Sequence, residues 1–325
     1  MDDYEFLHFL SQYNYWSTRI YAWKSLRDRF APDYKEWLQK RNQQLSSENN
    51  NNDMPDVKYN ETKVQTPEAT TSDEKLNDLI ENIRKAKVCM IAGRPSLGKT
   101  DMVLSIAKNT AIEQGIPTLF FSSELNTEQL TNRMVSNLCE LEIEGIGTNT
   151  YNENRHEIYV KGMKRVKNSP LFIDDTHSLS VLELAPKVRQ LVGKQWIRLV
   201  IVDYLQLMKR GGSSCFDEEP TKIVHSMREL AMELNITFIV CAQLPPRARG
   251  ERKRPGLSTI KRFWGNIEKE TDMIVCLHRP EYYRIMRKDD EEVHGIAEII
   301  VVKNAFSEKH NFHLIYRPRF CRFYD

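Results

Sequence analysis

The chain has 325 residues, of which 40% are hydrophobic, so it is long and apolar enough for two domains or one domain with appendages. Its 47 Lys and Arg against 45 Asp and Glu leave a formal net charge of +2, which excludes nucleic-acid binding driven by overall charge. The chain opens without a basic leader, has no apolar run near the roughly 20 residues of a membrane span, and carries six cysteines without zinc spacing. We therefore expect a cytoplasmic protein with no membrane partner.

The first zone of the chain, residues 1–45, is rich in aromatic residues and contains three of the five tryptophans. Apolar side chains recur there with the spacing of one helix face at Phe6, Phe9, Leu10 and Tyr13. We expect a short helical N-terminal segment that either binds a partner protein or another subunit, or packs as a small subdomain on the main core. Residues 46–72 are polar and Asn-rich, which predicts a flexible linker.

Residues 73–325 form the third zone, in which apolar, β-branched runs alternate with helical patterns. Strands are predicted for 87–93, 117–124, 170–175, 197–205, 236–243, 271–279, 297–304 and 312–319. Helices are predicted for 74–86, 100–115, 127–140, 181–192 and 221–235. Either Asn126 or Thr127 is expected to cap the helix 127–140. This alternation predicts an α/β domain with a mostly parallel central sheet that helices cover on both faces.

The segment GRPSLGKT, residues 93–100, matches the pattern G-x-x-x-x-G-K-[ST] between a predicted strand and a predicted helix. Its glycines let the backbone wind tightly around an anion, and the helix adds its N-terminal dipole. The lysine can reach the β- and γ-phosphates, and the threonine hydroxyl can bind Mg²⁺. The sequence therefore predicts an ATP and Mg²⁺ site made by Gly93, Ser96, Gly98, Lys99, Thr100 and Asp101. A chance glycine loop is the alternative.

Three polar residues end predicted parallel strands, the place where ligands bind in such sheets. Asp203 ends RLVIVD and is expected to hold Mg²⁺, directly or through water, unless it only shapes a turn. Glu124 ends LFFSSE and can act as general base beside the γ-phosphate; its alternative is an exposed residue near a helix start. Gln243 ends FIVCAQ and can sense the γ-phosphate for the following loop, unless it is a plain strand-end amide.

A basic segment follows Gln243, because residues 245–265 hold seven Lys and Arg but one acid, Glu251. Mobile cations neutralise phosphates, and exposed aromatic rings such as Phe263 and Trp264 can stack on the bases of a single strand. We therefore predict nucleic-acid contacts from Arg247, Arg249, Arg252, Lys253, Arg254, Lys261 and Arg262. The alternative is a solvated basic loop with both aromatic side chains packed inside.

These motifs together resemble the C-terminal ATPase domain of DnaB-type replicative helicases. The matching segments occur in order over about residues 88–325, as AGRPSLGKT, LFFSSELNTEQLTNRM, RLVIVDYLQLM, MRELAMELNITFIVCAQL and AEIIVVKN. The resemblance implies a RecA-like P-loop NTPase core, a homo-oligomer in the form of a hexameric ring, and transport of single-stranded DNA through that ring. It implies the same catalytic roles for Lys99, Glu124, Asp203 and Gln243 as those predicted above.

The sequence departs from this family at the end of its C-terminal region. The family carries Lys-x-Arg after a strand there, acting on the γ-phosphate of the neighbouring subunit, whereas this chain has Lys303-Asn304-Ala305. The resemblance thus assigns a catalytic role to Lys303, but Ala305 replaces an arginine finger of the kind that contributes ~10³–10⁵ in rate. By the same resemblance, helix 74–86 is expected to pack on a neighbouring subunit.

Three functions remain open at the level of sequence. The favoured interpretation is an ATP-dependent DNA helicase or translocase that acts on single-stranded DNA. The second is a nucleotide-gated adaptor that binds DNA or protein and hydrolyses ATP weakly or not at all, which the loss of the arginine finger favours. The third is a small-molecule kinase, against which the basic segment and the family resemblance both count.

Overall fold

The computed structural model describes residues 73–146, 153–177, 179–207, 219–245, 254–283, 287–288, 291–292 and 294–325. The predicted helical segment, residues 1–45, and the predicted linker, residues 46–72, lie outside these ranges, and both therefore stay predictions. Within these ranges, no helix combines the length and the apolar composition needed to cross a membrane.

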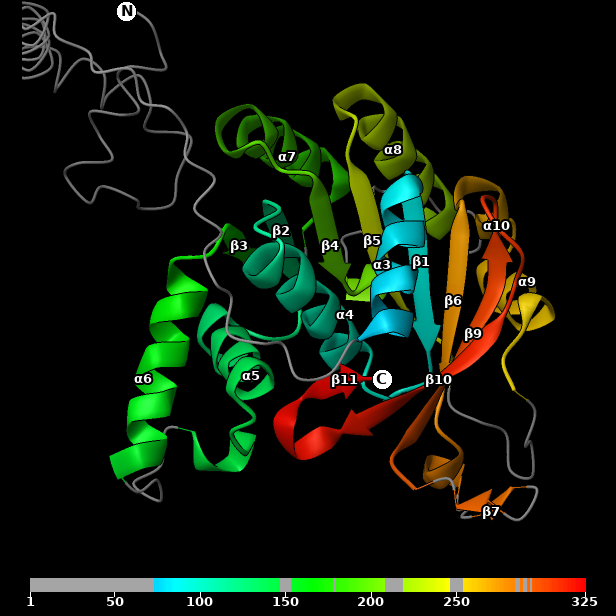
Figure 1. Cartoon of the computed structure of the whole chain (residues 1–325). Helices are drawn as coiled ribbons and strands as arrows, with labels where there is room; N and C mark the ends of the chain where they lie inside the picture. The colour runs from blue at the N-terminus through cyan, green and yellow to red at the C-terminus, as the bar shows by residue number, and fades with distance from the viewer. Residues whose placement is uncertain are drawn as a thin grey trace, which may run out of the picture. The chain divides into compact units, whose positions relative to one another are not determined.

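The described part of the chain is built around one large sheet. A separate pair of short strands, β7 (Arg287–Lys288) and β8 (Glu291–Glu292), forms a second sheet. The strands of the large sheet are β1 (Val88–Gly93), β2 (Thr118–Ser122), β3 (Leu171–Asp174), β4 (Leu199–Asp203), β5 (Thr237–Gln243), β6 (Met273–His278), β9 (Ile296–Asn304), β10 (Asn311–Arg317) and β11 (Arg322–Tyr324). They lie in the order β11-β10-β9-β6-β1-β5-β4-β2-β3 (Figure 1). The strands from β6 to β3 are parallel, whereas β9, β10 and β11 add antiparallel pairs, so the predicted mostly parallel sheet is confirmed.

Helix α3 (Glu74–Lys85) precedes β1, and the other helices lie in the connections between strands. These are α4 (Lys99–Ala107), α5 (Thr127–Cys139), α6 (Glu153–Lys167), α7 (Val181–Gln195), α8 (Glu219–Leu234), α9 (Leu257–Trp264) and α10 (Ile267–Glu270). A π-helical turn, Lys108–Glu113, continues α4. Asn126 caps α5, because its side chain accepts from the Gln129 N–H at 2.8 Å. The sequence did not predict α6, which buries little beyond Gly162 and Val166 and so lacks a clear apolar stripe.

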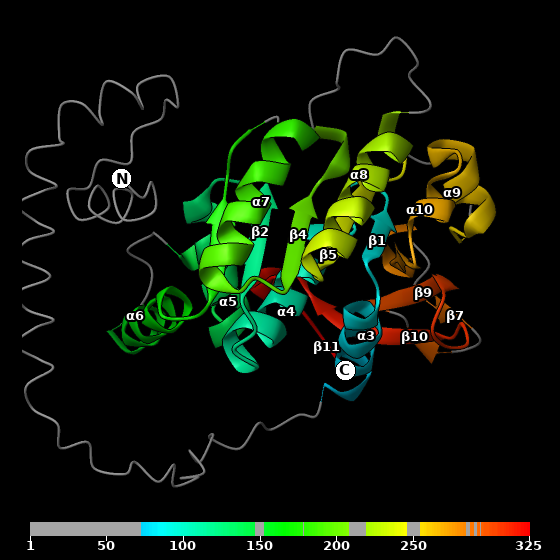
Figure 2. The same cartoon turned by 90° about the horizontal axis from the view of Figure 1, so that it is seen from above.

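Helices cover both faces of the sheet (Figure 2). The central strands divide their side chains between two cores, one on each face. Cys89 and Ile91 of β1 belong to the core that α3, α4 and α5 cover. Val88, Met90 and Ala92 belong to the core that α7, α8, α9 and α10 cover. Because both faces are covered, all residues of β1 and β4 are buried, as the continuous apolar runs predict.

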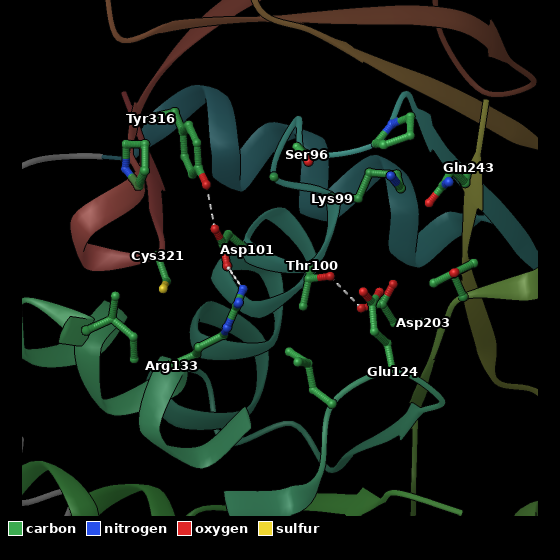
Figure 3. A pocket seen from close by; sticks show the side chains of 16 residues that line it. Ser96, Lys99, Thr100, Asp101, Glu124, Arg133, Asp203, Gln243, Tyr316 and Cys321 are labelled. Carbon is green, nitrogen blue, oxygen red and sulfur yellow. Dashed lines mark hydrogen bonds and ion pairs between the residues drawn. The ribbon is translucent and has the colours of Figure 1, made fainter. Parts of the chain in front are cut away.

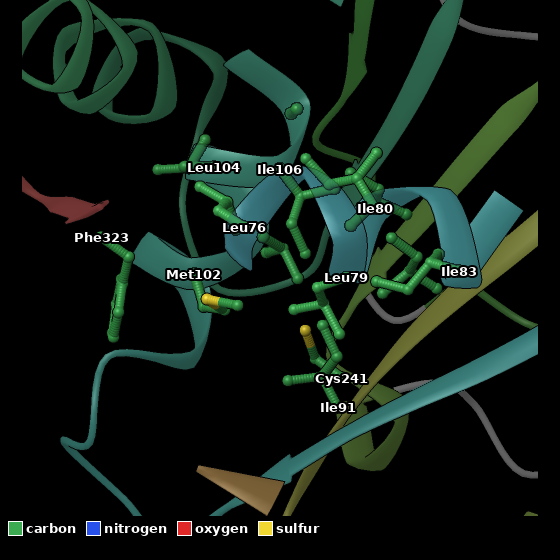
Figure 4. Packing of buried hydrophobic residues seen from close by; sticks show 14 of the residues in the cluster. Leu76, Leu79, Ile80, Ile83, Ile91, Met102, Leu104, Ile106, Cys241 and Phe323 are labelled. Atoms are coloured by element: carbon green, nitrogen blue, oxygen red, sulfur yellow. The ribbon is translucent and has the colours of Figure 1, made fainter. Parts of the chain in front are cut away.

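Helix α3 packs its apolar stripe on its own domain, and a contact of its remaining surface with a neighbouring subunit stays a prediction. Its apolar stripe is fully buried against residues such as Ile91 and Cys241 (Figure 4). The stripe consists of Leu76, Leu79, Ile80 and Ile83. Asp325 fixes the start of α3, because its carboxylate accepts from the N–H groups of Lys75 at 2.7 Å and Leu76 at 3.2 Å. The helix therefore closes one face of the core above β1.

Candidate active site

The loop between β1 and the N-terminus of α4 contains two residues with a left-handed backbone conformation. Ser96 has a φ of 60° and Gly98 a φ of 93°, the latter a conformation that glycine adopts at little cost. A Cβ atom on Gly98 would lie 2.9 Å from Cζ of Tyr316, so a side chain is also excluded by space. Gly98 is the N-cap of α4, whose first N–H groups and dipole favour an anion at this point.

Lys99 and Thr100 are the first two residues of α4, and both line the same cavity. The Lys99 Nζ donates to the carbonyl oxygen of Arg94 at 3.1 Å, which holds the ammonium group over the loop. Burial lowers the pKa of Lys99, while nearby negative groups, among them Asp203 and Glu124, oppose that shift. The Thr100 hydroxyl donates to Oδ2 of Asp203 at 2.7 Å, which joins the loop to the end of β4.

Asp203 at the end of β4 supplies a buried oxygen that fits a metal ion. The residue is 2% exposed, and its Oδ1 has no hydrogen-bond partner among the residues that the structure describes. Burial raises the pKa of Asp203, against the Thr100 hydrogen bond and the Lys99 charge. An unpaired buried carboxylate oxygen is costly, and Mg²⁺ prefers oxygen ligands while keeping waters and phosphate oxygens as its others. Asp203 and Thr100 therefore fit Mg²⁺, although the described residues hold no cluster of three or more His, Cys, Asp or Glu.

Glu124 reaches the cavity through a tight turn after β2. The Ser122 hydroxyl donates to the carbonyl oxygen of Leu125 at 2.6 Å and accepts from its N–H at 3.1 Å. The Ser123 N–H donates to the carbonyl oxygen of Asp203 at 2.8 Å, so the ends of β2 and β4 are joined. The Glu124 side chain is exposed and lines the cavity, where it can take a proton from water.

Gln243 ends β5 directly beside the phosphate-binding loop. It pairs in register with Gly93, and the next residue, Leu244, donates its N–H to the Gly93 carbonyl oxygen at 2.9 Å. The Gln243 side chain lines the cavity, as predicted from its place at a strand end, whereas Gly93 is not among the lining residues. The strands β1, β5, β4 and β2 are neighbours in the sheet, so all of their carboxyl ends meet at one edge.

These residues surround a cavity of about 600 Å³, a volume typical of small-molecule sites (Figure 3). Figure 3 shows Lys99, Glu124, Asp203 and Gln243 on one side of Thr100. Figure 3 shows Arg133, Tyr316 and Cys321 on the other side of Thr100, and Ile143 and Pro318 also line the cavity. The sequence had singled out none of these five residues as part of a site. The structure therefore brings the predicted phosphate, metal and water-activating groups together and adds a second wall.

Asp101, predicted to bind nucleotide, contributes to that second wall through protein contacts. Its Oδ1 is paired with the Arg133 guanidinium at 3.0 Å, and its Oδ2 accepts from the Tyr316 hydroxyl at 2.5 Å. Burial, and then the Asp101 charge, raise the pKa of Tyr316, so the phenol stays protonated as a donor. Both carboxylate oxygens are thus engaged by protein groups. No local signal links Asp101 to Tyr316, 215 residues away, which explains why sequence reasoning missed this contact.

The basic segment is described in part. Arg247, Arg249, Arg252 and Lys253 lie outside the described residues. Arg254 is paired with Glu298 at 2.9 Å, Lys261 with Glu268 at 3.2 Å, and Arg262 lies over the Phe263 ring. Phe263 is 46% exposed, but Trp264 is 6% exposed and packs in the core, so the prediction that both rings are available to bases is wrong for Trp264.

Lys303 on β9 lies away from the cavity of its own chain. Its Nζ donates to the carbonyl oxygens of Glu268 and Thr271, each at 2.6 Å. These bonds tie β9 to the end of α10, and Lys303 is not among the residues that line the cavity. A catalytic role for this lysine on another subunit stays a prediction.

Comparison with known proteins assigns the chain to a family. Residues 69–325 match the family model described as DnaB-like helicase C terminal domain. The chain is 31% identical over 274 residues to the probable replicative DNA helicase of Trieres chinensis, across 83% of this chain and 60% of that relative. It is 29% identical over 253 residues to the replicative DNA helicase DnaB of Leifsonia xyli subsp. xyli, across 77% of this chain and 54% of that relative.

Solved structures show the same architecture. One of them, a solved ATPase domain, is similar with a TM-score of 0.68 at 25% identity, over 74% of this chain and 84% of that one. The structure of a DnaB-like replicative helicase, described with its primase interactions, has a TM-score of 0.67 at 24% identity, over 73% and 58% of the two chains.

The fold is that of an ATPase domain with RecA-like architecture, and the loop between β1 and α4 has the P-loop sequence pattern. Since the family model matches most of its length, the chain belongs to the DnaB-like helicase C-terminal domain family. It spans 60% and 54% of the lengths of the two named relatives.

Proposed function

We propose that this chain binds ATP with Mg²⁺, hydrolyses it, and acts as a DnaB-type helicase or translocase on single-stranded DNA. The observation that carries the proposal is the convergence of Lys99, Thr100, Glu124, Asp203 and Gln243 on one cavity. These residues follow four adjacent strands and together offer phosphate binding, metal binding, a general base and a sensor. Membership of a family whose relatives are named replicative DNA helicases supports the same function.

In the proposed reaction, each side chain has one task. The loop N–H groups and the Lys99 ammonium bind the β- and γ-phosphates. Mg²⁺, held by Thr100 and Asp203, would supply positive charge beside these phosphates. Glu124 takes the proton from the water that attacks the γ-phosphorus, and the bond from the γ-phosphorus to the β–γ bridging oxygen breaks, so that ADP and inorganic phosphate leave. The side-chain amide of Gln243 donates to a γ-phosphate oxygen. Asp101 orients Arg133 and Tyr316 along the rest of the nucleotide, because it already binds both.

Single-stranded DNA is the proposed partner of the basic segment after Gln243. Arg254 and Lys261 already have carboxylate partners, which leaves less of their charge for phosphates. The largest share of phosphate binding is therefore assigned to Arg247, Arg249, Arg252 and Lys253. The exposed Phe263 ring offers a surface on which a base can stack.

A homo-oligomeric ring is the proposed assembly, by likeness to the family. Residues 1–45 are proposed to bind a partner protein or another subunit. Lys303 acts on a neighbouring subunit only if it gives up its bonds to Glu268 and Thr271.

A second candidate function is a nucleotide-gated adaptor that binds ATP and turns it over slowly. Ala305, at the position of the family's arginine finger, favours it, because the finger supplies much of the rate in such enzymes. The bonds that hold Lys303 inside its own chain point in the same direction.

Steady-state ATP hydrolysis by the full chain, with and without single-stranded DNA, distinguishes the two functions. The mass of the sample is measured by light scattering, so that activity refers to a known oligomer. A helicase is expected to show hydrolysis that DNA stimulates and that Lys99→Ala abolishes, because that variant loses the phosphate-binding ammonium. Tight ATP binding with background hydrolysis, unchanged by DNA, would establish the adaptor instead.

A further inference from the structure

The Gln206 side chain joins the ends of two strands that both lead to the cavity. It belongs to the 3₁₀ turn Leu205–Leu207, which follows Asp203 and β4. Its Nε2 donates to the carbonyl oxygen of Gln243 at 2.6 Å, and its Oε1 accepts from the Gln243 N–H at 3.1 Å. One amide therefore satisfies both backbone groups of Gln243.

This contact connects the chain segments after β4 and β5 beyond the point where the backbone pairing of the two strands ends. The last register pair between these strands is Val202 with Val240, three residues before Gln243. On its other side, β5 remains paired with β1 as far as Gly93 and Gln243. Gln243 is thus held between the phosphate-binding loop and Gln206, and its side chain lines the cavity.

The Gln206 side chain is exposed, so its amide group does not need these two bonds to satisfy its own donor and acceptor. Water could satisfy an exposed amide, and fixing a long side chain costs rotamer freedom. The bonds instead fix the strand end that carries Gln243. Beyond Gln206 and Gln243, the chain continues into residues 208–218 and into residues 246–253 of the basic segment, both outside the described ranges.

We propose that Gln206 is a positioning residue that aims the Gln243 amide at the γ-phosphate and connects the ends of β4 and β5. Through it, a shift of Gln243 on nucleotide binding or hydrolysis is passed to both segments that continue from these strands. The inference deepens the proposed function and rests on it for the link to DNA. The contact between Gln206 and Gln243 itself does not depend on that function.

The test uses the variant Gln206→Met, which keeps an unbranched side chain of similar length but removes donor and acceptor. The matched control is Gln195→Met, at an exposed glutamine that ends α7 and lies outside the cavity lining. Two readouts are needed. One is the kinetics of DNA-stimulated ATP hydrolysis, and the other is the hydrogen exchange of the backbone N–H of Gln243, which donates to Gln206. Because each neutral hydrogen bond contributes modestly, the loss of both is expected to change a rate constant about tenfold.

For Gln206→Met, we expect DNA-stimulated kcat to fall about tenfold while KM for ATP changes less than about twofold. The Gln243 amide should exchange faster in this variant, and Gln195→Met should match the wild type in both readouts. Wild-type exchange at Gln243, or a wild-type kcat in DNA, would overturn the inference. If the wild type itself shows no stimulated hydrolysis, the proposed function is wrong, and exchange at Gln243 still decides whether Gln206 holds that strand end.

Discussion

Gly98 meets two separate demands, a left-handed backbone and the close approach of an aromatic ring. Gly115, after the π-helical turn that continues α4, meets only the first, with a φ of 66° and no described atom within 4 Å of its Cβ position. The pair therefore separates backbone strain from steric exclusion.

We expect Gly115→Ala to cost about 1–2 kcal/mol of unfolding free energy, the strain of a left-handed alanine. Gly98→Ala should cost more and should weaken binding of a fluorescent ATP analogue at least tenfold, because Tyr316 must move away from the loop. Urea unfolding and fluorescence titration measure the two effects. Equal costs and unchanged binding in both variants would show that the Tyr316 contact does not constrain the loop.

Glu124 is predicted to act in chemistry and not in binding, because it lies at the exposed side of the cavity. Glu124→Gln is expected to lower kcat by about 10²–10⁴-fold, the usual contribution of a general base, with ATP affinity nearly unchanged. Single-turnover hydrolysis and equilibrium ATP binding measure the two quantities. Glu128→Gln, an exposed glutamate in the first turn of α5, is the matched control and should behave as wild type.

Among the elements, α10 is tied to its surroundings by polar contacts. The Lys303 ammonium donates to two carbonyl oxygens near the C-terminal end of α10. Glu270 of α10 accepts from Nδ1 of His225 on α8 at 2.8 Å. Just beyond, Asp272 accepts from Arg228 at 2.7 Å and from the N–H groups of Lys87 at 2.7 Å and Val88 at 3.3 Å. This carboxylate therefore links α8, the start of β1 and the start of β6.

Asp272→Asn is predicted to lower the free energy of unfolding by about 2 kcal/mol at neutral pH, since hydrogen bonds to a charged acceptor are lost. Burial alone would raise the pKa of Asp272, but Arg228 and the two backbone N–H groups outweigh it and lower the pKa from 3.8. A carboxyl whose folded-state pKa is lowered stabilises the fold above its unfolded pKa and loses that effect as pH falls through the folded value.

The difference between wild type and Asp272→Asn should therefore shrink in urea titrations as the pH is lowered below about 4. Asp78→Asn, an exposed residue on α3, serves as the control and should leave the stability unchanged. A difference that stays constant down to the most acidic pH would contradict the assignment of this effect to the Asp272 charge.

At the scale of the whole molecule, the antiparallel edge of the sheet completes the site. Strands β10 and β11 bring Tyr316 and Phe323 over the phosphate-binding loop, with their rings stacked at 4.3 Å between centroids. Strand β9, in the same edge, ends in Asn304, beside the exposed Ala305. The edge therefore lines the cavity of its own chain and also carries the position at which the resemblance predicted an arginine finger.

Ala305→Arg is expected to raise the ATP turnover of the oligomer at least tenfold if the proposed ring brings this position to a neighbouring cavity, because an arginine finger contributes ~10³–10⁵ in rate. Turnover per subunit is measured across a range of protein concentrations, together with mass by light scattering. Ser307→Arg adds the same group two positions further along and should have little effect. A turnover unchanged by Ala305→Arg in a confirmed oligomer would show that no neighbouring cavity lies at this position.

Much of the fold and half of the cavity could be predicted from the sequence, because their signals are local. Continuous apolar runs specify buried parallel strands, and a glycine loop between strand and helix specifies a phosphate site whatever surrounds it. Lys99, Thr100, Glu124, Asp203 and Gln243 follow from their places at strand ends, and the structure brings them together.

The tertiary structure alone decided which distant side chains meet. The pairing of Asp101 with Arg133 and Tyr316, the burial of Trp264 and the use of Lys303 as a tie to α10 leave no periodic or motif signal. The same holds for the packing of α3, whose amphipathic pattern fits a neighbour's surface as well as its own core. Such contacts depend on strand order and on the path of the antiparallel edge, which place residues far apart in the chain at bonding distance only after the sheet has formed.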